Sequence, residues 1–113
     1  MNKDVKAKWV AALRSGEYKQ TQNRLREGNA FCCLGVLCNL HAKAHRRIAA
    51  DQTRPSVYMD HTHELPEDVM VWAGLGTDIG DKVVINGRKR SLAEHNDQGR
   101  TFKQIADAIE AQL

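Results

Sequence analysis

The stretch Phe31–Leu40 (FCCLGVLCNL) is the longest apolar run in the sequence, and only Gly35 and Asn39 interrupt it. Such a run is too short to cross a bilayer, which takes about 20 apolar residues, so the rest of the chain must bury it. Within it, apolar residues recur at helical spacing on one face: Cys33, Val36, Leu37 and Leu40. We therefore predict a central helix that is apolar over most of its circumference, capped near Asn29, continuing past His45 and ending near 46–47.

Helical spacing and terminal residues predict two further helices. In Lys3–Arg14 the apolar residues share one face, and Gly16 follows as a left-handed C-terminal cap. In 65–74, Pro66 suits the first helical position and Gly74 suits the cap at the other end. We expect Trp9 in the first helix, and Val69 and Trp72 in the second, to face the core.

Near the C-terminus, two capping boxes predict a pair of short helices. Ser91-Leu92-Ala93-Glu94 opens the first, which Gly99 closes, and Thr101-Phe102-Lys103-Gln104 opens the second. The second helix carries one apolar face made of Phe102, Ile105, Ala106 and Ile109.

Extended structure is predicted in a few places. Lys82–Arg90 has the Asn-Gly dipeptide of a two-residue hairpin turn, and its cationic second arm predicts an exposed edge strand. The polar stretch 17–26 suggests a short extended arm, and Ser56–Met59 a strand within the less regular segment 49–64. The sequence thus predicts an α+β fold: one mostly helical domain over 1–113, built around a buried central helix, with a small β-hairpin.

The composition indicates which partners and which cellular compartment suit the protein. The net charge of +3 is mild, so it permits an acidic partner without requiring one. The cysteine count is odd, with all thiols inside one stretch of seven residues, which does not fit a disulfide framework and suggests a reducing compartment. Without an apolar leader segment or lipidation motif, we expect a cytoplasmic protein with no membrane association. The oligomeric state is left open.

A metal site is one chemistry that the residues of the central helix offer. Cys38, His41 and His45 share one helix face, and His61 and His63 could reach them from the following loop. These are zinc ligands by type, but their spacing matches no closed zinc motif. We favour a buried cysteine followed by solvent-facing histidines, and we predict neither a metal nor a cofactor.

Catalysis by a cysteine is a second chemistry that the sequence offers. A thiolate at Cys32 would be favoured near a helix N-terminus, with His95 as a conceivable base. The apolar neighbours Phe31 and Leu34 instead favour burial, which leaves a thiol inert. The sequence also lacks a Walker loop, a Gly-x-Ser-x-Gly elbow and a dinucleotide fingerprint. We therefore predict that the protein is not an enzyme.

DNA binding by a helix-turn-helix was the third possibility. The two C-terminal helices surround a glycine turn, as such a unit requires. However, the outward positions of the last helix include Asp107 and Glu110, which phosphates would repel. We favour a helical hairpin that closes the core.

A cationic contact surface was the last possibility. Arg88, Lys89 and Arg90 form the densest cluster, and other arginines stand as possible neighbours: Arg46, Arg47, Arg54 and Arg100. Arginine-rich edges suit carboxylate or phosphate recognition. A charged edge strand equally prevents aggregation, and the sequence leaves both roles open.

Several stretches together carry a family resemblance. They are 9–20, the Phe-Cys-Cys-Leu-Gly-Val-Leu-Cys string within 31–40, Leu65-Pro66 with 72–75, and Ser91–Glu94 with 96–97 and 102–110. In this order they resemble a group of small uncharacterised accessory proteins of bacteriophages and prophages. The resemblance implies a phage protein in the cytoplasm of a bacterial host. It supplies no activity and no catalytic residues.

From these considerations we expect a phage accessory protein that binds and inhibits a host factor, such as an anti-CRISPR or other anti-defence protein. Because the chain is not acidic, it does not suit mimicry of DNA and is expected to dock on a protein surface through Arg46, Arg47, Arg88, Lys89 and Arg90. The alternatives are a protein that sequesters a nucleotide signal, with Tyr58 or Trp72 stacking on a base, and a nucleic-acid-binding protein.

Overall fold

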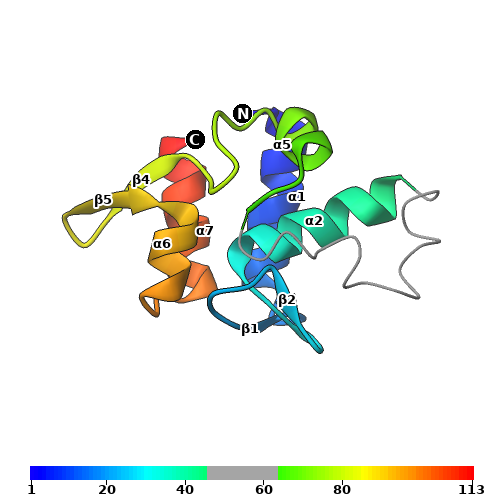
Figure 1. The fold of residues 1–113 in the computed structure, drawn as a ribbon. Helices are drawn as coiled ribbons and strands as arrows, with labels where there is room; N and C mark the ends of the chain where they lie inside the picture. Colours follow the sequence, from blue (N-terminus) through cyan, green and yellow to red (C-terminus); the bar gives the residue numbers. More distant parts are fainter. Residues whose placement is uncertain (46–63) are drawn as a thin grey trace.

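The predicted central helix forms the middle of the molecule as α2 (Cys33–Ala44). The computed structural model describes residues 1–45 and 64–113, and Figure 1 shows α2 crossing behind the small strands and in front of α1. Most of its side chains are buried, which confirms the prediction of a helix that is apolar nearly all round. Its last residue is Ala44, and the expected end near 46–47 lies outside the described residues.

The start of α2 differs from the prediction. Its N-cap is Cys32, whose Sγ accepts a hydrogen bond from the Gly35 N–H at 3.4 Å, and not Asn29. Phe31 is not helical, because it pairs with Gln20 and Arg26 in a small sheet. The apolar run therefore includes the last residue of a strand as well as most of a helix.

That small sheet precedes α2 and has the strand order β1-β3-β2. Its strands are β1 (Lys19–Gln20), β2 (Arg26–Glu27) and β3 (Ala30–Phe31). β3 pairs with β1 in parallel and with β2 antiparallel. The expected extended arm thus exists.

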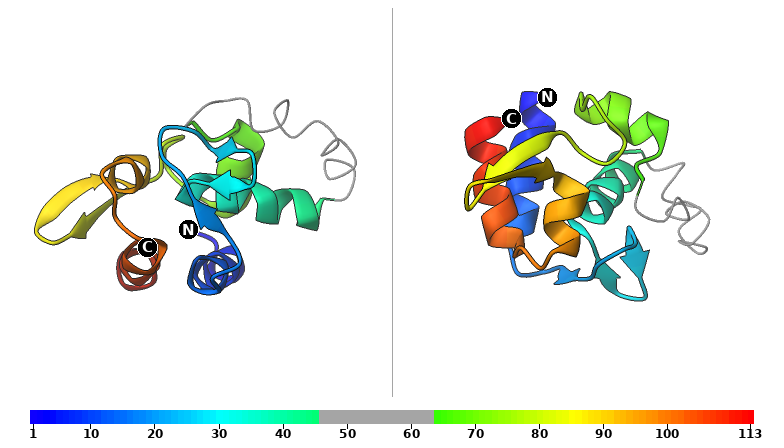
Figure 2. Two further views of the ribbon diagram at one scale, coloured as in Figure 1. Left: turned by 90° about the horizontal axis from the view of Figure 1, so that it is seen from below. Right: turned by 60° about the vertical axis from the view of Figure 1, so that its left-hand side comes forward.

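The two ends of the chain pack side by side as helices. α1 (Lys3–Arg14) and α7 (Phe102–Gln112) lie against each other in both views of Figure 2. Both predicted features of α7 are confirmed: the Thr101 capping box, and the burial of its apolar face. The Trp9 side chain of α1 is fully buried, and its Nε1–H donates to the Cys33 carbonyl at 2.9 Å.

Helix α5 (Glu67–Ala73) covers the other flank of α2. Gly74 ends it at φ 70°, as expected of a left-handed cap. Pro66 is the residue before the helix and not its first member, because its ψ of 146° is extended. Val69 is buried as predicted, whereas Trp72 is only partly buried.

The predicted hairpin and the next helix follow. The strands are β4 (Lys82–Ile85) and β5 (Arg88–Ser91), joined by Asn86 and Gly87 at φ 52° and 77°, as a tight two-residue turn requires. Ser91 then caps α6 (Leu92–Asp97) with the predicted capping box. In Figure 1 the hairpin projects from the side of the molecule farthest from the C-terminal end of α2.

The described residues therefore form an α+β fold in which helices predominate and the sheets are small. The suggested strand Ser56–Met59, and the rest of 49–63, lie outside the described residues. None of the described helices is long and apolar enough to span a membrane.

Candidate functional site

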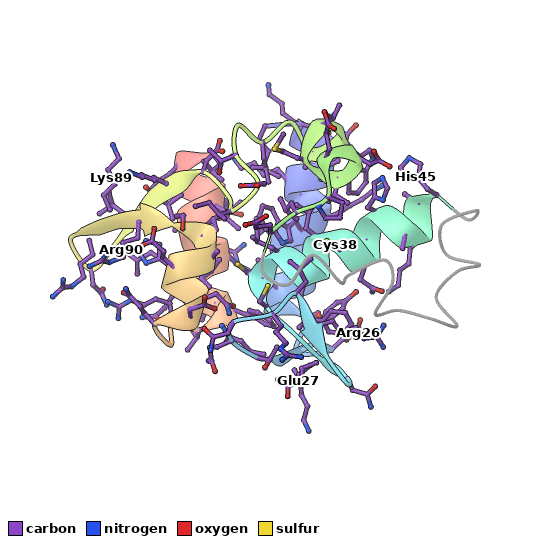
Figure 3. The ribbon with its side chains drawn as sticks, viewed as in Figure 1. Arg26, Glu27, Cys38, His45, Lys89 and Arg90 are labelled. Carbon is purple, nitrogen blue, oxygen red and sulfur yellow. The ribbon has the colours of Figure 1, made fainter. Side chains whose placement is uncertain are left out.

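The hairpin presents the densest cationic surface of the described chain. Arg88 and Lys89 are exposed, while Arg90 keeps 35% of its side chain exposed and forms an ion pair with Glu94 at 3.6 Å. No ion pair joins Arg88 or Lys89 to another described residue. Figure 3 shows Lys89 and Arg90 on the outside of the projecting hairpin. We call Arg88, Lys89 and Arg90 the hairpin cations.

The register of the hairpin assigns these side chains to its two faces. Arg88 and Arg90 stand opposite Ile85 and Val83, whose side chains are buried, so they lie on the face of the hairpin that meets the core. Lys89 stands opposite Val84, which is 45% exposed, so both lie on the outer face. The hairpin therefore carries cations on both faces of one strand.

The two edges of the hairpin differ. Because the residues flanking a two-residue turn bond each other, Val84 and Lys89 direct their backbone N–H and C=O groups outward. At Val84 the side-chain amide of Gln112 satisfies both groups, accepting from the N–H at 2.7 Å and donating to the C=O at 2.8 Å. At Lys89, no described residue bonds either group. Thus α7 closes the β4 edge at Val84, and the β5 edge is open at Lys89, while at Ser91 the outward N–H donates to Glu94.

Of the other arginines considered for this surface, Arg46, Arg47 and Arg54 lie outside the described residues. Arg100 is partly buried, and its backbone N–H donates to the carbonyl of His95.

The cysteines do not form a nucleophilic site. Burial raises the pKa of the Cys32 thiol to about 11, so the thiol is protonated at neutral pH. Cys33 and Cys38 are also fully buried, and burial raises their thiol pKa values as well. The conceivable base His95 is engaged elsewhere, because its Nε2–H donates to the Val83 carbonyl at 2.8 Å.

The histidines on α2 form an aromatic cluster with α5. The rings of His41 and His45 stack with centroids 4.2 Å apart, and each meets Trp72 edge-on. His41 is 3% exposed, so the expectation that it faces solvent is wrong, whereas His45 is exposed. Burial, then the neighbouring His45, lowers the His41 pKa, and Asp68 partly opposes this shift.

The metal hypothesis finds no ligand cluster in residues 1–45 and 64–113, where no group of His, Cys, Asp or Glu side chains is arranged to hold an ion. His61 and His63, the residues that could reach this helix face from the following loop, lie outside these ranges.

The polar face of α7 forms ion pairs with α1. Arg14 of α1 binds Asp107 at 2.7 Å and Glu110 at 3.0 Å. Ion pairing with Arg14 lowers the pKa values of both carboxyl groups. These carboxylates therefore fix α7 to α1, which agrees with a helical hairpin that closes the core better than with a DNA-reading helix.

A second cationic cluster, not anticipated from the sequence, surrounds Tyr18. The Tyr18 hydroxyl accepts hydrogen bonds from Asn39 at 2.6 Å and Lys43 at 3.4 Å. Its ring meets Phe31 edge-on, and the Arg26 guanidinium lies 5.0 Å from the centre of the Phe31 ring. These residues come from several segments between 18 and 43 that meet only in the fold, so no single local pattern indicates the cluster.

These features define a small α+β domain with a projecting cationic hairpin. Comparison with known families identifies the family. The chain matches the family described as Domain of unknown function (DUF8296) over residues 1–113, so it belongs to that family. Neither the curated proteins nor the solved structures gave a match.

Proposed function

We propose that this protein acts without catalysis, by binding and inhibiting a protein of a bacterial host, and that it belongs to the accessory proteins of phages. A defence complex, such as a CRISPR effector, is the target class we favour. The observation that carries the proposal is the projecting hairpin, whose Arg88 and Lys89 side chains are exposed without a carboxylate partner among the described residues.

The chemistry of the described residues supports a binding role. The thiols, which are the nucleophiles that the sequence offers, are buried and protonated at neutral pH. The buried polar side chain of Asn96 is used to hold the fold together, since it accepts from the Cys33 N–H and donates to the Thr21 carbonyl. The exposed cations, by contrast, serve no evident structural purpose beyond protecting the strand edge.

The test is capture of a partner from a bacterial lysate with the tagged protein. The variant R88S/K89S/R90S should lose at least about tenfold of the retained partner, because charged groups at the centre of an interface contribute strongly to binding. The matched control replaces Lys3, Lys8 and Lys19, which are exposed elsewhere, by Ser and makes the same change in net charge. The proposal fails if both variants retain the partner equally well.

A nucleotide or nucleic acid is the second candidate ligand, because the Tyr18 cluster combines aromatic rings with cations. Lys43 lies 5.7 Å from the centre of the Tyr18 ring, close to the Arg26–Phe31 pair. Nucleic-acid binding would weaken steeply with salt. A cyclic dinucleotide at a hundred dissociation constants would stabilise the fold by about 2.7 kcal/mol. Thermal unfolding with these ligands at two salt concentrations distinguishes the candidates.

A further inference from the structure

The two strand edges of the hairpin differ at their middle positions, Val84 on β4 and Lys89 on β5. Gln112 satisfies both outward backbone groups of Val84, so β4 has no free pairing position there. On β5 the outward N–H and C=O of Lys89 find no partner among the described residues. An open edge of this kind pairs readily with another extended chain.

We infer that β5 binds its partner by strand addition, and that the added strand is an acidic, extended segment of the partner protein. This inference rests on the proposed function, because it states how the same hairpin holds the partner. Lys89 supplies the backbone donor and acceptor, and the hairpin cations supply the charge.

Charge complementarity selects an acidic segment. A strand added beside β5 places its side chains alternately on the two faces of the hairpin. On the core-side face they meet Arg88 and Arg90, and on the outer face they meet Lys89. Opposite charges at neighbouring cross-strand positions are favourable, whereas like charges are unfavourable. Glu94 neutralises only part of this charge, since its one ion pair is with Arg90 at 3.6 Å.

The geometry also provides a substitution that separates strand pairing from charge attraction. Because the Lys89 N–H points away from β4, Lys89→Pro removes the outward donor without removing a hydrogen bond inside the hairpin. Lys89→Thr is the matched control, because it removes the same charge and keeps the N–H. Far-UV circular dichroism and thermal unfolding establish that both variants fold.

The probe is the peptide Thr-Glu-Val-Glu-Val-Glu-Thr with blocked ends, titrated into the whole protein and followed by NMR. The control peptide has the same sequence and charge but is N-methylated at every backbone nitrogen, so its backbone cannot donate hydrogen bonds. We expect the unmodified peptide to slow exchange of the Lys89 amide hydrogen by about tenfold or more at saturation. Lys89→Pro should bind it about tenfold more weakly than Lys89→Thr, as the loss of one hydrogen bond predicts.

Three results would overturn the inference. In the first, both peptides bind equally and the Lys89 amide is unprotected, so that attraction is by charge alone. In the second, neither peptide binds. In the third, Lys89→Pro and Lys89→Thr bind alike. Because the N-methylated peptide is tested on the unchanged protein, the outcome does not depend on the folding of Lys89→Pro. None of these results decides the proposed function, which fails separately if R88S/K89S/R90S still captures the partner.

Discussion

Gly35 shows how a single residue sets the position of a helix. A Cβ atom added at Gly35 would lie 1.7 Å from the Leu25 carbonyl oxygen, so only glycine allows the backbone before β2 to approach α2 so closely. That same carbonyl accepts the Cys32 N–H at 3.1 Å, just before the helix begins. Gly35 therefore interrupts the apolar run because the Leu25 backbone packs against it, and α2 continues through this position.

Gly35→Ala should destabilise the fold by about 3 kcal/mol or more, because the clash is with backbone and neither element can move without repacking the core. Urea unfolding followed by circular dichroism measures this loss. Gly76→Ala is the control, since its added Cβ would meet a side-chain oxygen of Asp81 at 3.3 Å and its backbone is not left-handed. Equal stability of the two variants would show that the α2 contact is not tight.

Residue-scale features could be predicted where their cause is local. The Asn86-Gly87 turn and the Ser91 and Thr101 capping boxes depend on neighbours within a few residues, and the sequence predicted all of them. The roles of Gly35 and Gln112 depend on segments that are distant along the chain, and nothing near them in the sequence indicates the contact.

At the scale of the element, burial of the cysteines makes α2 sensitive to alkaline pH. The pKa of Cys32 is raised to about 11 in the fold, against about 8.5 for an unperturbed thiol. The folded state therefore holds the proton more tightly than the unfolded state does. The contribution of the protonated Cys32 thiol to the free energy of unfolding is complete below about pH 8.5. It is lost as the pH rises towards 11, by about 1.4 kcal/mol per pH unit.

Cys32→Ser isolates this effect, because serine is a favoured N-cap residue and does not titrate. We expect the wild type to lose stability relative to Cys32→Ser by about 1.4 kcal/mol per pH unit above pH 8.5. Urea unfolding at several pH values measures the difference, in which titration of groups that do not interact with Cys32 cancels. Parallel pH profiles would mean that the thiol is not held protonated by the fold.

The contact between α2 and α6 depends on the side chain of Asn96. This fully buried side chain accepts from the Cys33 N–H at 3.1 Å and from Gln20 at 2.9 Å, and donates to the Thr21 carbonyl at 2.7 Å. Asn96→Leu should cost about 2–4 kcal/mol, because it leaves the buried Cys33 N–H and the partly buried Thr21 carbonyl without their Asn96 partner. Gln20→Leu is the milder control, since it removes a partner at a partly buried position. Equal losses in urea unfolding would contradict a central role for Asn96.

Element-scale prediction succeeded for the existence of the helices and failed at the starts of α2 and α5. The 3.6-residue spacing and the terminal residues predicted α1 and α7 with their correct apolar faces. At the start of α2, the apolar pattern continues through Phe31, which lies in a strand because of its pairing with β1 and β2. Burial makes a strand end and a helix start look alike in sequence, since both are apolar.

At the scale of the whole molecule, the two chain ends complete the core. The buried faces of α1 and α7 meet, and the Arg14 ion pairs with Asp107 and Glu110 lie along their exposed side. The sequence predicted both helices but not their pairing, because an apolar face indicates burial and does not name its partner. The same reasoning applies to the candidate site: the hairpin cations were predicted, whereas the closure of β4 by Gln112 was not.

A chain that stops after Arg100 should therefore lose its cooperative fold. Removing α7 exposes the core residues that it covers and deletes three fully buried or nearly buried large side chains, Phe102, Ile105 and Ile109. Each contributes about 1.5–3 kcal/mol by burial, and their sum approaches the 5–15 kcal/mol of net stability typical of a domain. The truncated chain should show no sigmoidal urea transition, whereas Lys103→Ala, at an exposed position of α7, should unfold as the wild type does. A cooperative transition in the truncated chain would show that α1 and α2 form a core without the C-terminal helix.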